Sequence, residues 1–415
     1  MYNNFGFDNK IVDYVNGFEA KLDSTFKDIE KIYEHNQLKV LKAFIDNKVS
    51  DSHFNGSSGY GYNELGRDII ESVYKDVFGT EDALVREQIV SGTHAISLVL
   101  FSILRPGDNI LSITGIPYDT LHKTIGLSES KSSLREFNVG FDYIDLLSND
   151  FNYNKIKEKI DNKTKLIMIQ RSRGYSDRYP ISVDKIKKVT EFIKSINKDL
   201  TIFVDNCYGE FVEKNEPTDV NVDIMCGSLI KNPGGSLALT GGYVVGKKNL
   251  IELCADRLTS PGIGKEVGIS FNQNRNILQG LYLAPQIVKN ALKINRLFAI
   301  TLNSFGIKTI PLYNEPLNDI VLAIKFDDKD KITTFCNVIQ STSPIDSFAK
   351  TVSDDMPGYD DKVIMAAGCF VSGSSIELSC DAPIREPYYS YLQGGINYYQ
   401  GKLALIKAIK ELKLL

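Results

Sequence analysis

The sequence predicts an α/β fold in which a mostly parallel sheet lies between two layers of helices, with a smaller α+β domain after it. Two observations predict this fold. Short apolar runs alternate with helical stretches through the middle of the chain, as in parallel sheets covered on both faces. After about residue 290 the alternation stops, and further strands precede an amphipathic terminal helix.

Each expected element follows from a segment of the chain. Residues 10–48 alternate charged and apolar positions at helical spacing, which predicts an N-terminal arm, and a second helix is expected over 67–78. The buried strands of the large domain are expected in EQIVSG, NILSIT, KLIMIQ, LTIFVD, DIMCGSLI and GGYVVG. DIVLAIKF, KVIMAAGCFV and SSIELSC predict strands of the small domain, and GKLALIKAIKELKLL predicts its helix. The expected units are an arm (1–50), a large domain (51–290) and a small domain (291–415).

Composition narrows the class of protein. With 415 residues, 43% of them hydrophobic, the chain can bury more than one core. A net charge of −4 with mixed signs argues against nucleic acid as a partner. No run of 18 apolar residues and no cationic start before an apolar stretch is present, so we expect a cytoplasmic protein without a membrane segment. The six cysteines are widely spaced without a CxxC pair, which predicts free thiols and no metal site.

The strand LTIFVD ends in a carboxylate, Asp205. Ligands of parallel sheets bind beyond the carboxyl ends of the strands, so residues that follow each run are candidates for chemistry. A carboxylate at such a place needs a cationic or hydrogen-bonded partner. The protonated pyridine nitrogen of a cofactor would supply one. Capping of a following helix is the alternative.

The strand DIMCGSLI leads directly into Lys231 and a glycine-rich turn. Apolar and small residues surround this lysine, so we expect a depressed pKa and a nucleophilic amine. An exposed turn lysine is the alternative. Ser228, three residues earlier, could bind a phosphate oxygen or close the turn.

A possible anion site follows EQIV, where Gly92 and Thr93 precede a helix. Unpaired amides and the positive end of the dipole favour an anion there. Neither the P-loop pattern nor GxGxxG is present, which disfavours ATP and dinucleotides. His94 is expected on the cofactor face, because no second histidine lies at metal-ligand spacing.

Two aromatic segments complete the set of candidates. Tyr118, after NILSIT, could stack on a flat cofactor or belong to the core. The segment GYGYNELGRD carries Tyr60, Tyr62 and Arg67, which suit a phosphate, although a surface loop explains them nearly as well. A phosphate turn, a stacking ring, a buried acid and a lysine at successive strand ends together predict pyridoxal 5′-phosphate.

With these residues, the chain resembles the fold type I pyridoxal phosphate enzymes, most closely the aluminium resistance or methionine gamma-lyase-like family of carbon–sulfur lyases. GYGYNELGRD, SGTHAI, IPYDTL, VDNCYGEF and GSLIKNPGGSLALTGGYVVG carry the resemblance, which covers about residues 50–390. It implies that Lys231 holds the cofactor as an imine. The other implied cofactor contacts are Asp205 on the pyridine nitrogen, Gly92, Thr93 and Ser228 on the phosphate, Tyr118 on the ring and Tyr208 near the phenolic oxygen.

The resemblance also implies a homodimer or homotetramer, in which Tyr62 and Arg67 reach the phosphate in the neighbouring subunit. One departure concerns the substrate carboxylate. Relatives bind it with an arginine in a segment like RLS, whereas this chain has Glu377 at that place in SSIELSC. Arg385, shortly after, is expected to replace that arginine.

The implied reaction is β- or γ-elimination of a thiol from an amino acid of the cysteine, cystathionine or methionine type. Lys231 would remove the α-proton, and Lys231 or Tyr118 would take the second proton in γ-elimination. Two alternatives stay open: another pyridoxal phosphate reaction such as transamination, and a non-catalytic relative involved in metal stress.

Overall fold

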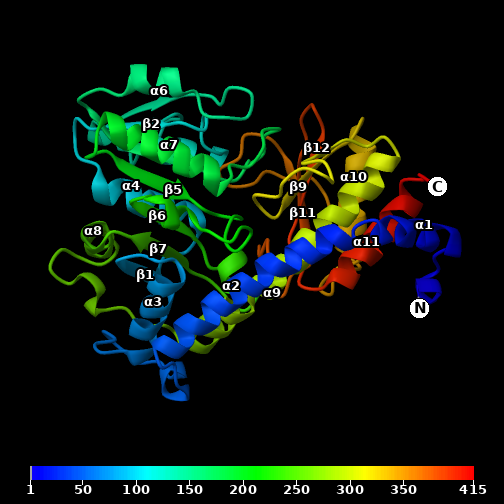
Figure 1. Ribbon diagram of the computed structural model, residues 1–415, viewed down its shortest axis with the longest axis horizontal. Helices are drawn as coiled ribbons and strands as arrows, with labels where there is room; N and C mark the ends of the chain where they lie inside the picture. The colour runs from blue at the N-terminus through cyan, green and yellow to red at the C-terminus, as the bar shows by residue number, and fades with distance from the viewer. Residues whose placement is uncertain (1) are drawn as a thin grey trace.

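The computed structural model describes residues 2–415 and contains a seven-stranded and a five-stranded sheet (Figure 1). The order of the larger sheet is β1-β7-β6-β5-β4-β2-β3. Neighbours from β3 to β6 are parallel, whereas β7 is antiparallel to both β6 and β1. The predicted, mostly parallel sheet is therefore confirmed. Its strands are β1 (Asp82–Arg86), β2 (Asn109–Ser112), β3 (Gly140–Tyr143), β4 (Thr164–Gln170), β5 (Thr201–Asp205), β6 (Ile224–Ser228) and β7 (Gly242–Gly246).

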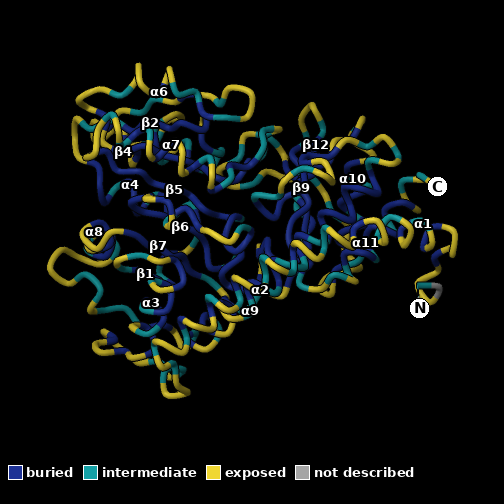
Figure 2. Tube along the Cα trace, in the orientation of Figure 1, coloured by how far each residue is buried: buried dark blue, intermediate teal, exposed yellow. Residues whose placement is uncertain are grey.

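Helices cover both faces of this sheet, which gives three layers. Successive side chains of a strand point to opposite faces, so Ile202 and Val204 of β5 join one core while Phe203 joins the other. The first core is covered by α3 (Leu65–Val77), α6 (Tyr153–Lys159) and α7 (Val183–Ile196), and the second by α4 (Gly92–Ile103), α5 (His122–Ile125) and α8 (Lys248–Leu258). Figure 2 shows the strands buried between exposed outer loops.

The second sheet is antiparallel throughout, in the order β10-β11-β12-β9-β8. One of its faces packs against helices in a core of its own. On the other face, Tyr389 and Tyr391 pack with Tyr175, Tyr179 and Tyr208 of the large domain. The elements are β8 (Thr309–Ile310), β9 (Val321–Lys325), α10 (Lys329–Ser341), β10 (Val363–Ala366), β11 (Ser379–Pro383), β12 (Tyr389–Gln393) and α11 (Tyr398–Glu411).

Two long helices connect the two halves of the molecule. The predicted arm forms α1 (Asn9–Ala20) and α2 (Asp23–Asp46), and α2 runs beside α9 (Asn274–Ser304) (Figure 1). Buried residues of α9 up to Leu292 belong to the core of the large domain, and those from Ile294 belong to the small one. The domain boundary near residue 290 stays a prediction, because α9 crosses it without interruption. No helix in the described range, 2–415, is both long and apolar enough to cross a membrane.

Short 3-10 helices occupy the connections: η1 (Tyr2–Phe5), η2 (Asp51–Phe54), η3 (Asp119–Leu121), η4 (Leu134–Phe137), η5 (Pro217–Val220), η6 (Asn232–Gly234) and η7 (Gly264–Glu266).

Two strand predictions were wrong in position. The strand expected in EQIVSG ends earlier, at Arg86, and the residues that follow form a turn before α4. The strand expected in SSIELSC begins only at Ser379. The carboxylate of Glu377 accepts hydrogen bonds from the amides of Phe370 and Val371 at 2.9 and 3.0 Å. This buried carboxylate stabilises the turn at residues 370 and 371. The segment around Glu377 therefore does not continue the strand.

Candidate active site

A cavity of about 720 Å³ opens at the carboxyl ends of β4 and β5 and faces the small domain. Its volume suits a small-molecule site. Five of the predicted residues line it: Lys231, Asp205, Tyr118, Tyr208 and Arg385. Residues that follow the carboxyl ends of separate strands, where we expected the chemistry, therefore meet in one cavity.

Lys231 follows β6 and directly precedes η6. Its Nζ atom lies 3.9 Å from the centre of the Tyr208 ring and makes no hydrogen bond or ion pair within the described chain. Burial by itself lowers the pKa of this lysine, but Cys207, Tyr208, Tyr118 and Asp205 outweigh burial, and the pKa is raised well above its usual value. The expectation of a depressed pKa was wrong, because the acidic neighbours come from distant segments.

Asp205 ends β5, on the strand next to β6, and is 2% exposed. Its Oδ1 accepts a hydrogen bond from the amide of Cys207 at 3.1 Å. No basic nitrogen of residues 2–415 lies within 4.0 Å of the carboxylate. Burial raises the pKa of Asp205, and the nearby Lys231 opposes that shift. No helix begins directly after Asp205, so it does not act as the cap that was the alternative.

The N-terminus of α4 closes one side of the site. Ser91 caps the helix by accepting from the amide of His94 at 3.0 Å. A Cβ atom on Gly92 would lie 3.1 Å from Sγ of Cys207 and 3.5 Å from Cβ of Ser228. Gly92 thus lets the N-terminus of α4 pack closely against Cys207 and the Ser228 side chain beside the cavity, although Gly92, Thr93 and Ser228 do not themselves line it. The first helical amides therefore lie next to Ser228. This is a suitable cradle for a phosphate group.

Tyr118 joins this cradle to the cavity wall. Its hydroxyl lies 2.8 Å from Oγ1 of Thr93, and its amide donates to Oε1 of Gln170 at 3.0 Å. Burial and Asp205 raise the pKa of the phenol, so it keeps its proton at neutral pH.

These features fit pyridoxal 5′-phosphate group by group. Among the described residues, Lys231 offers an amine without a hydrogen-bond or ion-pair partner, and Asp205 offers a buried carboxylate that lacks a paired cation. The α4 N-terminus offers unpaired amides beside Gly92. An aldehyde, a pyridine nitrogen and a phosphate would satisfy these three groups in turn.

His94 does not belong to this cavity. Its Nδ1 accepts from the amide of Val90 at 3.2 Å, and the side chain lines a second depression with Phe101 and Arg257. The structure therefore contradicts its placement on the cofactor face. At the start of α4 the Thr93 side chain points toward Tyr118, whereas His94, the next residue, points to the second depression.

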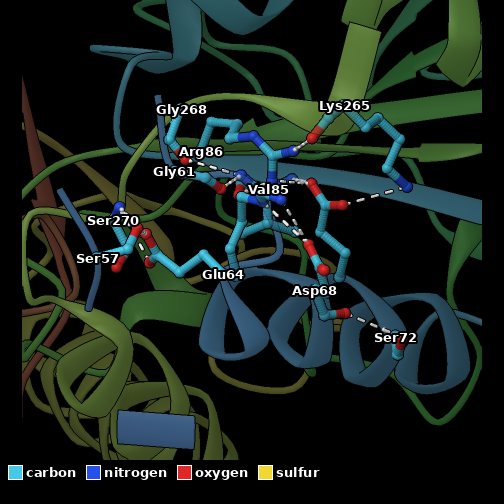
Figure 3. Close-up of polar contacts among 12 residues, drawn as sticks. Ser57, Gly61, Glu64, Asp68, Ser72, Val85, Arg86, Lys265, Gly268 and Ser270 are labelled. Carbon is cyan, nitrogen blue, oxygen red and sulfur yellow. Dashed lines mark hydrogen bonds and ion pairs between the residues drawn. The ribbon is translucent and has the colours of Figure 1, made fainter. Parts of the chain in front are cut away.

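Neither Tyr62 nor Arg67 lines the cavity of its own chain. Tyr62 is 62% exposed, whereas Arg67 is 3% exposed. Nη1 of Arg67 donates to the carbonyls of Gly61 and Gly268 at 2.7 and 3.2 Å. Figure 3 shows the two glycines close to each other and the Glu64 side chain directed toward Ser57 and Ser270. The amide of Ser270 donates to Oε1 of Glu64 at 3.2 Å. Arg67 thus braces its own loop, and the exposed Tyr62 is the better candidate for contact with a neighbouring subunit.

Arg385 lines the cavity at a place that is partly open to water. Its side chain is 41% exposed and forms an ion pair with Asp361 at 2.8 Å. It also donates to the carbonyl of Tyr175 at 3.2 Å. An arginine that is already paired and partly in water is a weak anchor for a substrate carboxylate.

Sequence reasoning missed the segment after β4 and one acid of the small domain. Arg173, Tyr175 and Arg178 follow KLIMIQ and line the cavity, as does Asp381 of β11. The three nitrogens of the Arg173 guanidinium are buried and have no hydrogen-bond partner in the described chain. The strand-end rule could have found the arginines. No local signal marked Asp381, because the small sheet reaches the cavity only through domain packing.

Comparison with known proteins agrees with this geometry. Residues 11–413 match the family model described as methionine gamma-lyase. The chain belongs to this family. A solved structure from Listeria monocytogenes, provisionally named a cystathionine beta-lyase involved in aluminum resistance, is 49% identical. It superposes with a TM-score of 0.94 and covers 96% of this chain and 99% of its own.

Two further structures extend the comparison. A carbon–sulfur lyase involved in aluminum resistance from Clostridium novyi is 45% identical, with a TM-score of 0.94 and coverage of 99% of this chain and 97% of its own. A pyridoxal-5′-phosphate dependent protein from Escherichia coli, at 15% identity and a TM-score of 0.62 over 93% of this chain and 97% of its own, shares the fold alone. The family assignment makes the chain a pyridoxal phosphate-dependent carbon–sulfur lyase with the fold of type I enzymes.

Proposed function

We propose that this lyase removes a sulfur leaving group from the β or γ carbon of an amino acid, with Lys231 as the base. One observation carries the proposal. Lys231 and Asp205 come from the ends of adjacent strands, line the same cavity, and have no ion-pair partner within the described residues. Such an amine and acid suit the two ends of one cofactor ring.

Bound pyridoxal phosphate supplies an electron-poor ring that stabilises negative charge at Cα of the substrate. The chain's residues would position and protonate the reactants around it. Asp205 would keep the ring nitrogen protonated, because its buried carboxylate has no other cation beside it among the described residues. Gly92, Thr93 and Ser228 would hold the phosphate, and the amine of Lys231 would accept the α-proton.

Departure of the sulfur needs a proton donor near Cβ or Cγ. The phenol of Tyr118 lines the cavity and holds its proton, because burial and Asp205 raise its pKa. It is therefore better suited to donate a proton to the leaving sulfur than to remove one. In γ-elimination, Lys231 would also take the proton from Cβ, after its ammonium group has released the α-proton to water and become a free amine again.

The segment after β4 would attract the substrate carboxylate. Arg178 lines the cavity, and its Nη2 donates to the carbonyl of Gln170 at 2.8 Å. No carboxylate within residues 2–415 pairs with Arg178 or Arg173 inside 4.0 Å. Burial and the adjacent Arg173 lower the pKa of Arg178 to about 10, so it stays cationic at neutral pH. The two guanidinium groups give this wall a positive charge that a carboxylate would balance.

We also propose that the chain works at least as a homodimer. The rings of Tyr60 and Tyr62 contact each other at a tilt, with their centres 5.5 Å apart, and both are largely exposed. Two exposed aromatic rings on one loop suit a subunit contact. Tyr62 would then reach the phosphate in the neighbouring cavity.

Absorption and product analysis test the proposal. The wild-type protein with added cofactor should be yellow, and borohydride should remove the band; Lys231→Ala should lack that band. Cysteine, cystathionine or methionine should give keto acid and thiol without an added acceptor. Lys248→Ala, an exposed lysine at the start of α8, is the matched control and should behave as wild type. Keto acid only with an added acceptor would indicate transamination. A protein that stays colourless with cofactor would refute the proposal.

A further inference from the structure

The wall of the cavity formed by the small domain carries one acid, Asp381. It lies on β11 directly opposite Tyr391 of β12, so the two side chains share a face of the sheet. Cys380, the preceding residue, points into the core of the small domain. Asp381 is therefore directed to the cavity that holds Lys231, and it lines that cavity.

Only one oxygen of Asp381 has partners. Its Oδ2 accepts from the Tyr175 hydroxyl and from Nε2 of Gln393, both at 3.0 Å. Its Oδ1 accepts no hydrogen bond, and no basic nitrogen lies within 4.0 Å, among residues 2–415. A carboxylate in a cavity wall without a countercharge is unfavourable. Lys231 is the cation that acts on it from a distance, and its nitrogen is committed to the cofactor.

Aromatic rings surround this acid. Tyr175 stacks between Tyr359 and Tyr391, with ring centres 5.4 and 5.1 Å apart. The faces of tyrosine rings attract cations. A carboxylate with one free oxygen beside tyrosine rings is a suitable receptor for an ammonium group.

We propose that Asp381, together with Tyr175 and Tyr359, binds a second ammonium group on the leaving half of the substrate. The inference rests on the proposed function, because the α-amino group must face Lys231 and so cannot reach this acid as well. The substrate class is then a thioether whose two halves are both amino acids. A substrate with a single amino group would leave the carboxylate uncompensated.

A pair of substrates isolates this interaction. Cystathionine should be compared with the same thioether lacking the distal amino group, in wild type, Asp381→Asn and Asp355→Asn. Asp355 is 82% exposed in the same domain and, within the part of the chain that the structure describes, forms an ion pair with Lys362 alone, so its variant controls for loss of charge. Asp381→Asn should lower kcat/KM for cystathionine roughly 10- to 100-fold, mainly through KM, as expected for loss of a hydrogen bond to a charged group. For the deaminated thioether, kcat/KM should change little.

A binding measurement makes the result independent of turnover. In the Lys231→Ala background, calorimetry should show that cystathionine binds more weakly when Asp381→Asn is added, while the deaminated thioether does not. Tyr359→Leu, which removes part of the aromatic wall without touching the acid, should give a smaller loss in the same direction. The Tyr359→Leu variant tests the inference if Asp381→Asn fails to fold.

Three outcomes would overturn the inference: equal losses for both thioethers, no loss for either, or unchanged binding in the Lys231→Ala background. Failure of the proposed function gives a different result. In that case wild type would release no keto acid from either thioether, while the calorimetric comparison would still decide whether Asp381 binds the ammonium group.

Discussion

The amine nitrogen of Lys231 lies 3.9 Å from the centre of the Tyr208 ring. Tyr208 has a φ of 73°, a left-handed conformation that is uncommon for a tyrosine. Its carbonyl accepts from the amide of Ile320 at 3.2 Å, which ties the turn after β5 to the small domain. The backbone is thus held in a strained form that places a ring against the reactive amine.

Tyr208→Phe should make Lys231 less basic. The phenol is one of the groups that raise the pKa of this lysine, and phenylalanine keeps the ring without the acidic hydroxyl. Only the neutral amine reacts with an aldehyde, so the pH profile of the rate of cofactor incorporation should move to lower pH. The growth of the yellow band after mixing with cofactor measures that rate. An unchanged profile would mean that Tyr208 does not set the charge of the lysine.

Asp205→Asn should lower kcat strongly without weakening the fold. Loss of the ring-nitrogen partner should reduce kcat by about a hundredfold or more. Burial raises the pKa of Asp205, so its contribution to stability is largest at low pH and is lost as the carboxylate ionises. At neutral pH the uncharged amide of asparagine does not carry the unfavourable free energy of a buried negative charge. The melting temperature of the cofactor-free variant should equal or exceed that of wild type; a clear decrease would show that the acid stabilises the fold.

Gly92→Ala should weaken cofactor binding. The added methyl would meet Sγ of Cys207 at 3.1 Å in the proposed phosphate cradle. We expect the dissociation constant for pyridoxal phosphate to rise about tenfold or more, which corresponds to about 1.4 kcal/mol. Gly17→Ala is the control, because nothing lies within 4 Å of its added carbon in α1, and it should leave cofactor affinity unchanged. If both variants bound pyridoxal phosphate with the same affinity, the N-terminus of α4 would not be the phosphate site.

Arg178→Gln and Arg385→Gln should differ in their effect on KM. Arg178 lines the cavity and donates to backbone carbonyls, but it has no ion-pair partner within residues 2–415. Its loss should raise KM for the amino acid roughly tenfold or more. Arg385 is paired with Asp361 and is partly open to water, and its loss should change KM less than about threefold. Steady-state kinetics at constant cofactor concentration compare the two. The reverse order would restore Arg385 as the carboxylate anchor.

Stability should fall with rising pH because of Glu210. Burial raises the pKa of this acid to about 8, although the Tyr243 hydroxyl donates to it at 2.7 Å. A raised folded pKa means that the protonated form favours folding and that this contribution is lost as pH approaches 8. Urea unfolding should therefore show lower stability at pH about 9 than at about 6, by on the order of 1.4 kcal/mol for each pH unit between about 6 and the raised pKa. Glu210→Gln should remove much of that difference, and an equal slope in both proteins would contradict this explanation.

Local sequence pattern was enough to predict the cofactor-facing ends of the large sheet. The alternation in TIFVD determines which residues enter the two cores, and it leaves Asp205 at the strand end. The same reasoning places Lys231 after β6, since parallel neighbours end at the same edge. It placed His94 wrongly, because the direction of a side chain at a helix start depends on how the helix packs.

By itself, the sequence determined the parallel sheet, its helical layers and the residues at the ends of its strands, because backbone periodicity and side-chain polarity are local properties. Only the tertiary structure decided the charge of Lys231, the pairing of Arg385 and the presence of Asp381 in the cavity. Each of these depends on groups that come from distant segments, and electrostatic and packing forces act through space rather than along the chain.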